Sequence, residues 1–372
     1  MKLNKFNNDT FQFISKLKNI NWLIFFIIVI LAFIGCATLY SVSGGIFSFL
    51  VKSHLIKFCF SLSIFFIVFF LGKNIIYNFS YFFFFFTLFL LFILIFFGTE
   101  SAGSKRWLDL GLFTIQPSEI SKIGLILALS RYYNDFKQVK NSSIFKIIIS
   151  LLMVLLPFYL IIKQPDLGTG LLLLFIGLSI IFVSGISFTL IFFGTLFSSF
   201  AIPLIWGQLY DYQKRRILTF LNPESDPLGS GYHIAQSKIA IGSGGFFGKG
   251  YMNGSQSQLQ FIPEIHTDFI FSIFSEEFGF FGSSIIILLY AFIIVYGLLQ
   301  CLKTENYYNK LVIFGLTINI FLYFIVNISM VIGLLPVVGV PLPLVSFGGS
   351  AMLAAMISLS IIMCLKKNSS ST

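Results

Sequence analysis

The chain has 372 residues, a formal net charge of +10 and a mean hydropathy of +0.94; 57% of the residues are hydrophobic and 10% are charged. A soluble domain needs roughly a quarter of its residues charged, so this composition excludes a soluble globular enzyme. The positive residues are scattered between apolar runs and form no basic domain, which argues against nucleic acid as a partner. The four cysteines lie in or beside apolar runs and indicate no disulfide framework.

Runs of about 20 apolar residues, the length of a spanning helix, recur along the chain. Because lipid offers the backbone no hydrogen-bond partners, such runs form helices that satisfy their own polar groups. We therefore predict an all-α polytopic membrane protein, with tails at 1–21 and 366–372 and a transmembrane domain of about ten helices at 22–365. The expected spans are 22–42, 54–72, 75–98, 118–133, 145–163, 167–184, 187–206, 267–299, 309–334 and 344–365.

The charges predict the orientation of the chain, because short cytoplasmic loops are enriched in lysine and arginine. With both termini in the cytoplasm, most of the basic residues in short loops lie inside, among them Lys73, Lys137 and Lys366. All 14 acidic residues except Asp9, Asp135 and Glu305 then lie in or near outer loops. The outer loop at 207–266 is far longer than the others, and long loops in compact proteins are usually functional. Polar chemistry is therefore expected on the extracytoplasmic face.

A polar cluster precedes and opens the fourth span, with the sequences KRWLD at 105–109 and QPSEISK at 116–122. Pro117 suits the first position of a helix. Glu119 and Lys122 are three residues apart and lie on one helix face. Charges at membrane depth are costly and usually functional, but a structural ion pair between two helices is an alternative. Trp107 is a candidate contact residue or an interfacial anchor.

The long loop contains the Gly-rich sequence GSGGFFGKG at 242–250. It fails as a P-loop, because Ser243 replaces the first glycine and Gly250 replaces the Ser or Thr. We interpret it as a region of tight turns, whose backbone N–H groups could still face a phosphate.

The loop ends in PEIHTDFIF at 263–271, where Asp268 enters the apolar run. A side-chain oxygen of Thr267 or Asp268 could cap the helix that follows. Alternatively, Asp268 is a carboxylate at the membrane surface that takes a proton from a hydroxyl nucleophile. His266 would then orient it, or is a hydrogen-bonded spacer.

Two further segments that connect apolar runs are candidate functional sites. The sequence KQPDLGTG at 163–170 presents Asp166, as a helix cap or as a functional carboxylate. The sequence PVVGVPLPLVSFGGS at 336–350 cannot be helical throughout. At membrane depth it must face protein or a wet cavity, and a structural re-entrant turn is the simpler interpretation. No cofactor is required and no residues have metal-ligand spacing; a divalent cation, Mg²⁺ or Mn²⁺, beside the outer carboxylates stays an open alternative.

These stretches resemble the SEDS family of bacterial cell-wall proteins (shape, elongation, division, sporulation). The resemblance covers almost the whole chain beyond the N-terminal tail and rests on RWL at 106–108, QPSE at 116–119, PDLG at 165–168, IAIGSGG at 239–245, HTDFIF at 266–271 and PLP at 341–343. The sequences QSK at 236–238, GKG at 248–250, QSQL at 256–259 and VVGV at 337–340 are similar to the elongation branch rather than the division branch. Thr114 stands where several relatives carry arginine.

The resemblance implies a peptidoglycan glycosyltransferase of the bacterial inner membrane that polymerises lipid II during elongation and rod-shape maintenance. The implied partners are lipid II and glycan linked to undecaprenyl pyrophosphate, a class B penicillin-binding transpeptidase and membrane proteins of the elongation complex. A lipid II flippase is the alternative function, although no internal repeat typical of transporters is visible.

The residue patterns and the resemblance together predict Asp268 as the catalytic base. Negative charge develops on the departing pyrophosphate, where preorganised cations stabilise it; Arg215 is a further candidate cation. The predicted substrate-binding residues are Arg106, Trp107, Gln116, Glu119, Lys122, Asp166, Gln213, Arg216, Lys238 and His266.

Overall fold

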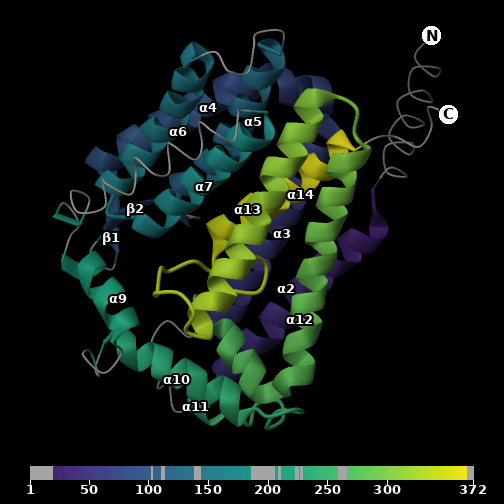
Figure 1. Cartoon of the computed structure of the whole chain (residues 1–372). Helices are drawn as coiled ribbons and strands as arrows, with labels where there is room; N and C mark the ends of the chain where they lie inside the picture. Colours follow the sequence, from purple (N-terminus) through teal and green to yellow (C-terminus); the bar gives the residue numbers. More distant parts are fainter. Residues whose placement is uncertain are drawn as a thin grey trace.

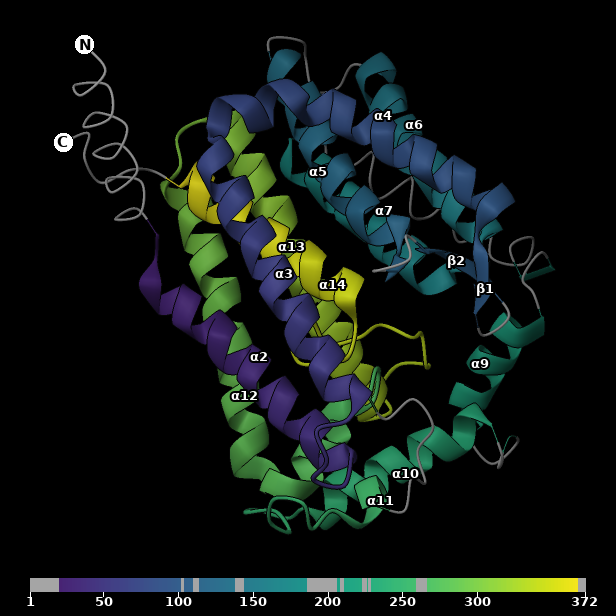
Figure 2. The ribbon, with the colours of Figure 1, turned by 180° about the vertical axis from the view of Figure 1, so that it is seen from behind.

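The computed structural model describes residues 20–101, 104–109, 114–137, 144–185, 206–207, 211–222, 226, 229–258 and 266–366. This part of the chain is a helical bundle with a small antiparallel sheet and several short helices at one end (Figures 1 and 2). The bundle helices are α2 (Trp22–Val42), α3 (Phe49–Leu71), α4 (Lys73–Phe97), α5 (Pro117–Asp135), α6 (Ile144–Lys163), α7 (Leu167–Val183), α12 (Ile270–Lys303), α13 (Tyr307–Val331) and α14 (Gly349–Leu365). Each matches one predicted span, while the predicted span at 187–206 lies almost wholly outside the described residues.

The described helices have the length and the exposed apolar surface expected of helices in a lipid bilayer. Six of the described helices are long and apolar enough to cross a membrane, and α7 and α14 are shorter apolar helices. The helix α4 exposes a row of large aromatic side chains that would be costly in water but not against lipid tails. These are Phe79, Phe82, Phe85, Phe86, Phe89, Phe92 and Phe96. The predicted all-helical, multi-pass membrane fold is confirmed.

Local sequence fixes where several helices begin. The side chains of Asn21, Asp166 and Asn306 accept hydrogen bonds from backbone N–H groups in the first turns of α2, α7 and α13, at 3.4, 3.3 and 3.0 Å. Such caps satisfy donors that the helix itself leaves without partners. Pro117 takes the first position of α5, as predicted.

The helices α3 and α4 divide the bundle into two groups. They meet at Gly72, whose φ of +83° suits a residue without a Cβ. They then diverge, so that α3 packs along α14 while α4 packs along α5 (Figure 2). The helix α13 contacts both α5 and α7 and joins the two groups.

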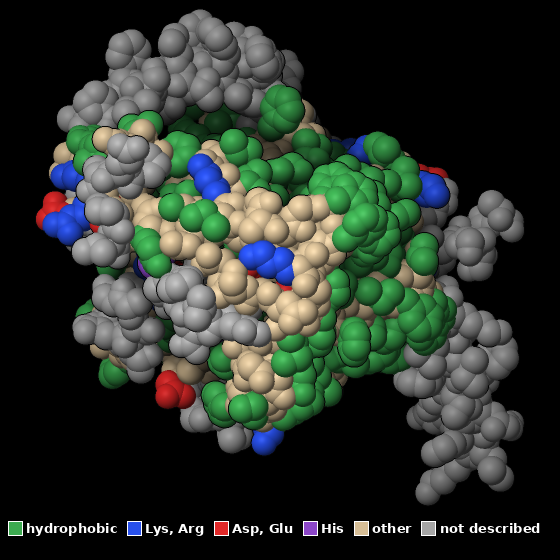
Figure 3. Space-filling model, turned by 90° about the horizontal axis from the view of Figure 1, so that it is seen from below, with side chains coloured by type: hydrophobic (Ala, Val, Ile, Leu, Met, Phe, Trp, Pro, Cys, Tyr) green, Lys and Arg blue, Asp and Glu red, His purple; other side chains and the backbone are tan. Residues whose placement is uncertain are grey.

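One end of the bundle carries the polar elements. Here lie the strands β1 (Thr99–Ser101), β2 (Ser104–Asp109) and β3 (Thr114–Ile115) and the helices α9 (Asp211–Leu221), α10 (Ser230–Ser243) and α11 (Ser255–Gln258). Seen from this end, lysine and arginine side chains lie among polar and backbone atoms, with hydrophobic side chains gathered around part of the rim (Figure 3).

The small sheet was not predicted, because its strands are too short and mixed to show an alternating pattern. Two predicted helix starts were also wrong: α3 begins at Phe49 rather than 54, and α14 begins at Gly349 rather than 344. In the second case a turn replaces the helix. The Ser346 hydroxyl accepts the Leu342 N–H at 2.8 Å, and Leu344 adopts a φ of +72° that no α-helix contains.

The Gly-rich stretch packs against a break in α12 at Gly279, where φ is +66°. Lys249 N–H and Gly250 N–H donate to the carbonyls of Glu276 and Glu277, both at 3.0 Å. In return, Phe280 N–H donates to Gly245 O at 2.9 Å. The interpretation as tight turns is confirmed, and the N–H groups at 249 and 250 are occupied by protein carbonyls rather than directed at a phosphate.

Candidate active site

Asp166 is the centre of a polar cluster at the start of α7. The residue is only 3% exposed, yet its side chain contacts three different elements. Oδ1 accepts the Thr169 N–H of its own helix, and Oδ2 accepts the side-chain amide of Gln116 at 2.9 Å. The Arg106 guanidinium lies 3.8 Å from Oδ1. Asp166 is therefore both the helix cap and the counter-ion that orients Arg106, so the two sequence interpretations are compatible.

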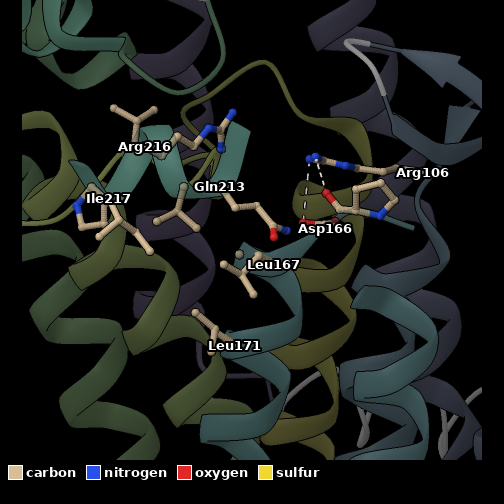
Figure 4. Close-up of a pocket in the computed structure, with 12 residues that line it drawn as sticks. Arg106, Asp166, Leu167, Leu171, Gln213, Arg216 and Ile217 are labelled. Atoms are coloured by element: carbon tan, nitrogen blue, oxygen red, sulfur yellow. Dashed lines mark hydrogen bonds and ion pairs between the residues drawn. The ribbon is translucent and has the colours of Figure 1, made fainter. Parts of the chain in front are cut away.

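Arg106 reaches this cluster from strand β2. Its Nη2 donates to the Pro165 carbonyl at 2.9 Å, which fixes the guanidinium beside the α6–α7 corner (Figure 4). Strand β2 pairs with β3, which leads directly into α5. The unpredicted sheet thus holds Arg106 and Gln116 next to the same carboxylate.

A pocket of about 130 Å³ opens beside this cluster. Helix α9 contributes Gln213 and Arg216 from the side opposite Arg106 (Figure 4). The pocket therefore combines two guanidinium groups with an apolar floor, which suits an anionic group attached to an apolar chain. The remaining lining residues are Pro165, Asp166, Leu167, Gly168, Leu171, Ile217, Pro336, Val337 and Val338.

The segment between α13 and α14, residues 332–348, forms one wall of this pocket. We call it the α13–α14 corner. It contains no regular helix, as its prolines and glycines predicted. It packs so closely on α7 that a Cβ added to Gly168 would lie 2.9 Å from the Val338 carbonyl oxygen.

Asp268 lies beside the α13–α14 corner and does not line the pocket. A Cβ added to Gly339 would lie 3.5 Å from Asp268 Oδ2, and Gly339 follows directly on the pocket residue Val338. The amide of Asn327 donates to the backbone carbonyls of both Asp268 and Val340, at 2.9 and 2.7 Å. This buried amide holds the aspartate segment against the corner. The N-cap position of α12 is Phe269, whose side chain makes no capping hydrogen bond.

Glu119 and Lys122 lie on one face of α5, as predicted, and form an ion pair at 3.0 Å. Both are buried, and the Tyr323 hydroxyl of α13 contacts both of them. They line neither this pocket nor the second one described below. The geometry fits a structural link between α5 and α13, and direct contact with a substrate stays a prediction.

The other predicted residues lie apart from the pocket. Trp107 is in β2 opposite Thr99, and Lys238 of α10 packs against Gly333. His266 is half-buried, and its carbonyl accepts the Phe347 N–H at 2.8 Å. The structure thus brings Arg106, Gln116, Asp166, Gln213 and Arg216 together and leaves Trp107, Lys238 and His266 outside.

Sequence reasoning missed Tyr323 and Asn327. A signal was available, because Asn319, Tyr323 and Asn327 recur every four residues in a largely apolar helix and therefore share a face. All three are buried. The cation site stays a prediction: no group of three or more potential metal ligands occurs within the described residues.

The chain is similar to a known family of proteins over almost its whole length. The FtsW/RodA/SpoVE family, described as cell cycle proteins, matches residues 20–371. The peptidoglycan glycosyltransferase MrdB of Escherichia coli (strain K12) is 47% identical over 270 residues, which covers 72% of each chain. The peptidoglycan glycosyltransferase RodA of Treponema pallidum (strain Nichols) is 34% identical, with 72% of this chain and 78% of that protein covered.

Two solved structures share the fold. One, described as a peptidoglycan synthase complex that coordinates polymerization and crosslinking, has a TM-score of 0.81 and 26% identity over 92% of this chain and 96% of that chain. The rod shape determining protein RodA of Thermus thermophilus has a TM-score of 0.70 and 24% identity, covering 92% and 95% of the two chains.

Proposed function

Because the chain belongs to the FtsW/RodA/SpoVE family, we propose that it is a peptidoglycan glycosyltransferase that joins lipid II disaccharides into glycan strands during cell elongation. The observation that carries the proposal is the position of the α13–α14 corner. One part of it lines the pocket that holds Arg106 and Arg216, and at the next residue, Gly339, an added Cβ would lie 3.5 Å from Asp268 Oδ2. A base and a binding site for an anionic leaving group therefore lie side by side.

In the proposed reaction, the Asp268 carboxylate takes the proton of the acceptor GlcNAc 4-hydroxyl. The oxygen forms a bond to the anomeric carbon of the lipid-linked donor with inversion, and the bond from that carbon to the pyrophosphate breaks. The leaving undecaprenyl pyrophosphate keeps the bonding electrons. Arg106, oriented by Asp166, and Arg216 stabilise the charge that develops on it.

The chemistry is proposed to occur on the extracytoplasmic side of the bacterial inner membrane, with both termini in the cytoplasm. The proposed partner is a class B penicillin-binding transpeptidase, together with membrane proteins of the elongation complex. The start of α4 and the ends of α5 and α12 lie at the bundle end opposite α9 and the small sheet (Figure 1). These helix ends carry Lys73, Arg131 and Lys303, which supports this orientation.

The test is polymerisation of fluorescent lipid II by the purified protein, with and without the transpeptidase, read as strands on a gel. We expect Asp268→Asn to lower the rate by about 10²–10⁴-fold, since a positioned general base contributes that much. The control is Glu305→Gln, which changes a carboxylate between α12 and α13 at the opposite end and leaves the rate unchanged. Long strands from the Asp268→Asn protein would remove Asp268 from the mechanism.

Reconstitution of the same protein in liposomes distinguishes the proposed enzyme from the alternative, a lipid II flippase. Movement of lipid II between leaflets without polymer would identify a flippase and contradict the proposed enzyme.

A further inference from the structure

A second pocket, of about 120 Å³, lies between α3, β3 and the start of α14. It shares no lining residue with the pocket beside Asp166. Its polar lining residues are Lys57, Ser61, Thr114 and Ser350, and none of its lining residues is acidic. The apolar remainder is Phe60, Ile115, Gly349 and Leu353.

Lys57 supplies a positive charge that no carboxylate neutralises within the described residues. Its ammonium lies 3.9 Å from the centre of the Phe347 ring. Its methylene groups lie against Gly349, where an added Cβ would come within 2.9 Å of Lys57 Cδ. The side chain is thus held at the first turn of α14. A half-buried cation that lines a pocket and has no carboxylate partner is available to an anionic ligand.

Ser61 is a second polar side chain of this pocket. It lies one turn after Lys57 on α3, is only 1% exposed and lines the pocket. Its hydroxyl can donate to or accept from a group bound there. The first turn of α14 adds backbone donors, because no side chain caps this helix. The Lys57 ammonium, the Ser61 hydroxyl and the N–H groups at the start of α14 together suit a phosphate group.

The second pocket is linked through Phe347 to the segment that carries Asp268. Phe347, which carries the Lys57 ammonium on its ring, donates its N–H to the His266 carbonyl at 2.8 Å. The rings of Phe347 and His266 are 6.0 Å apart, and His266 precedes Asp268 by two residues. Both pockets are therefore connected to residues next to Asp268, one through Gly339 and the other through Phe347.

We infer that this second pocket binds the pyrophosphate of one of the two lipid-linked saccharides that the reaction joins, with Lys57 as its principal cation. The inference rests on the proposed function, in which donor and acceptor each carry a polyprenyl pyrophosphate. The pocket beside Asp166 takes the pyrophosphate of the other substrate. Phe60, which lines the second pocket and is 39% exposed, offers the adjoining polyprenyl chain an apolar path to the lipid.

The test compares initial polymerisation rates over a range of lipid II concentrations. Lys57→Ala should raise the KM or shorten the strands by about tenfold, the usual effect of losing a charged hydrogen-bond donor. Lys57→Arg should restore most of the activity. Thr114→Arg, which places a cation in the same pocket from strand β3, should rescue the Lys57→Ala protein. The control is Lys163→Ala, because Lys163 also sits over an aromatic ring, that of Tyr159, but lines neither pocket.

Strand length at saturating lipid II shows whether the second pocket binds the pyrophosphate of the acceptor lipid II or that of the growing donor strand. If the pocket holds the acceptor, high lipid II restores the normal strand length of the Lys57→Ala protein. If it holds the growing donor strand, the strands stay short, because the strand dissociates between additions. Either result supports the inference.

Binding of undecaprenyl pyrophosphate to the Asp268→Asn protein, with and without Lys57→Ala, gives a readout that needs no catalysis. The Lys57 change should weaken this binding. Unchanged kinetics and unchanged binding would overturn the inference, as would a loss of activity that neither Lys57→Arg nor Thr114→Arg restores. A wild-type protein that makes no polymer would instead contradict the proposed function itself.

Discussion

Asp166 and Glu276 are both buried carboxylates at the polar end of the bundle, 3% and 0% exposed, but their surroundings differ. Glu276 accepts hydrogen bonds from Lys249 Nζ at 2.6 Å, from the Ser255 N–H and hydroxyl, both at 3.0 Å, and from Gln256 N–H. All of these donors come from the segment 249–256. Asp166 instead receives donors from α7, the start of α5 and β2, and it lines a pocket.

The contrast shows that burial and hydrogen bonding do not by themselves identify a functional carboxylate. Glu276 is enclosed by one loop and holds that loop on α12, so its role is structural. Asp166 joins separate elements at the edge of an open space and orients a guanidinium toward it. Substitution of Glu276 should therefore lower stability, and substitution of Asp166 should lower turnover.

The largest effect is expected for Glu276→Ala. The change leaves the Lys249 ammonium and several N–H donors without their acceptor, and breaking such a buried pair costs about 3–5 kcal/mol. Thermal unfolding in detergent should show a much lower Tm, while the rate per folded molecule stays normal. Ser255→Ala, which removes one of several bonds, is the mild control. A stable but inactive Glu276→Ala protein would place Glu276 in the catalytic machinery.

Asp166→Asn should lower the catalytic efficiency and leave the stability almost unchanged. Asparagine caps helices as well as aspartate does, so the Tm should change little. The charge that faces Arg106 at 3.8 Å and strengthens the hydrogen bond from Gln116 is lost. A hydrogen bond to a charged group is worth about 1.5–3 kcal/mol, so we expect kcat/KM to decrease by about tenfold to a hundredfold. Normal kcat/KM would show that Asp166 is a cap and nothing more.

The smallest of the three effects is expected for Asn327→Leu, which removes the amide between Asp268 and Val340. Two carbonyls lose their donor, at a cost of about 1–3 kcal/mol in stability. Because Asn327 positions Asp268 without touching either pocket, kcat should fall while KM stays close to normal. Asn319→Leu, two turns earlier on the same face of α13, is the matched control. Equal kinetics in the two variants would exclude a positioning role.

Much of the fold could be predicted from the sequence, because each spanning helix satisfies its own backbone and therefore depends on local composition. The prediction failed where short segments form turns and pairs that carry no periodic pattern. The three strands pair through the backbone within residues 99–115, and the turn at Leu344 is held by the hydroxyl of Ser346.

The sequence by itself determined the membrane-spanning helices, the irregular α13–α14 corner, the membership of the family and the residue types of the site, since apolar runs, prolines and motifs are local features. The tertiary structure alone decided which charges face a pocket and which face one another. Glu119 and Lys122 are charged residues in a family motif, as Arg106 and Asp166 are. In the structure, however, they pair with each other and contact the hydroxyl of Tyr323 of α13. That difference depends on contacts between helices far apart in the chain, which no local pattern encodes.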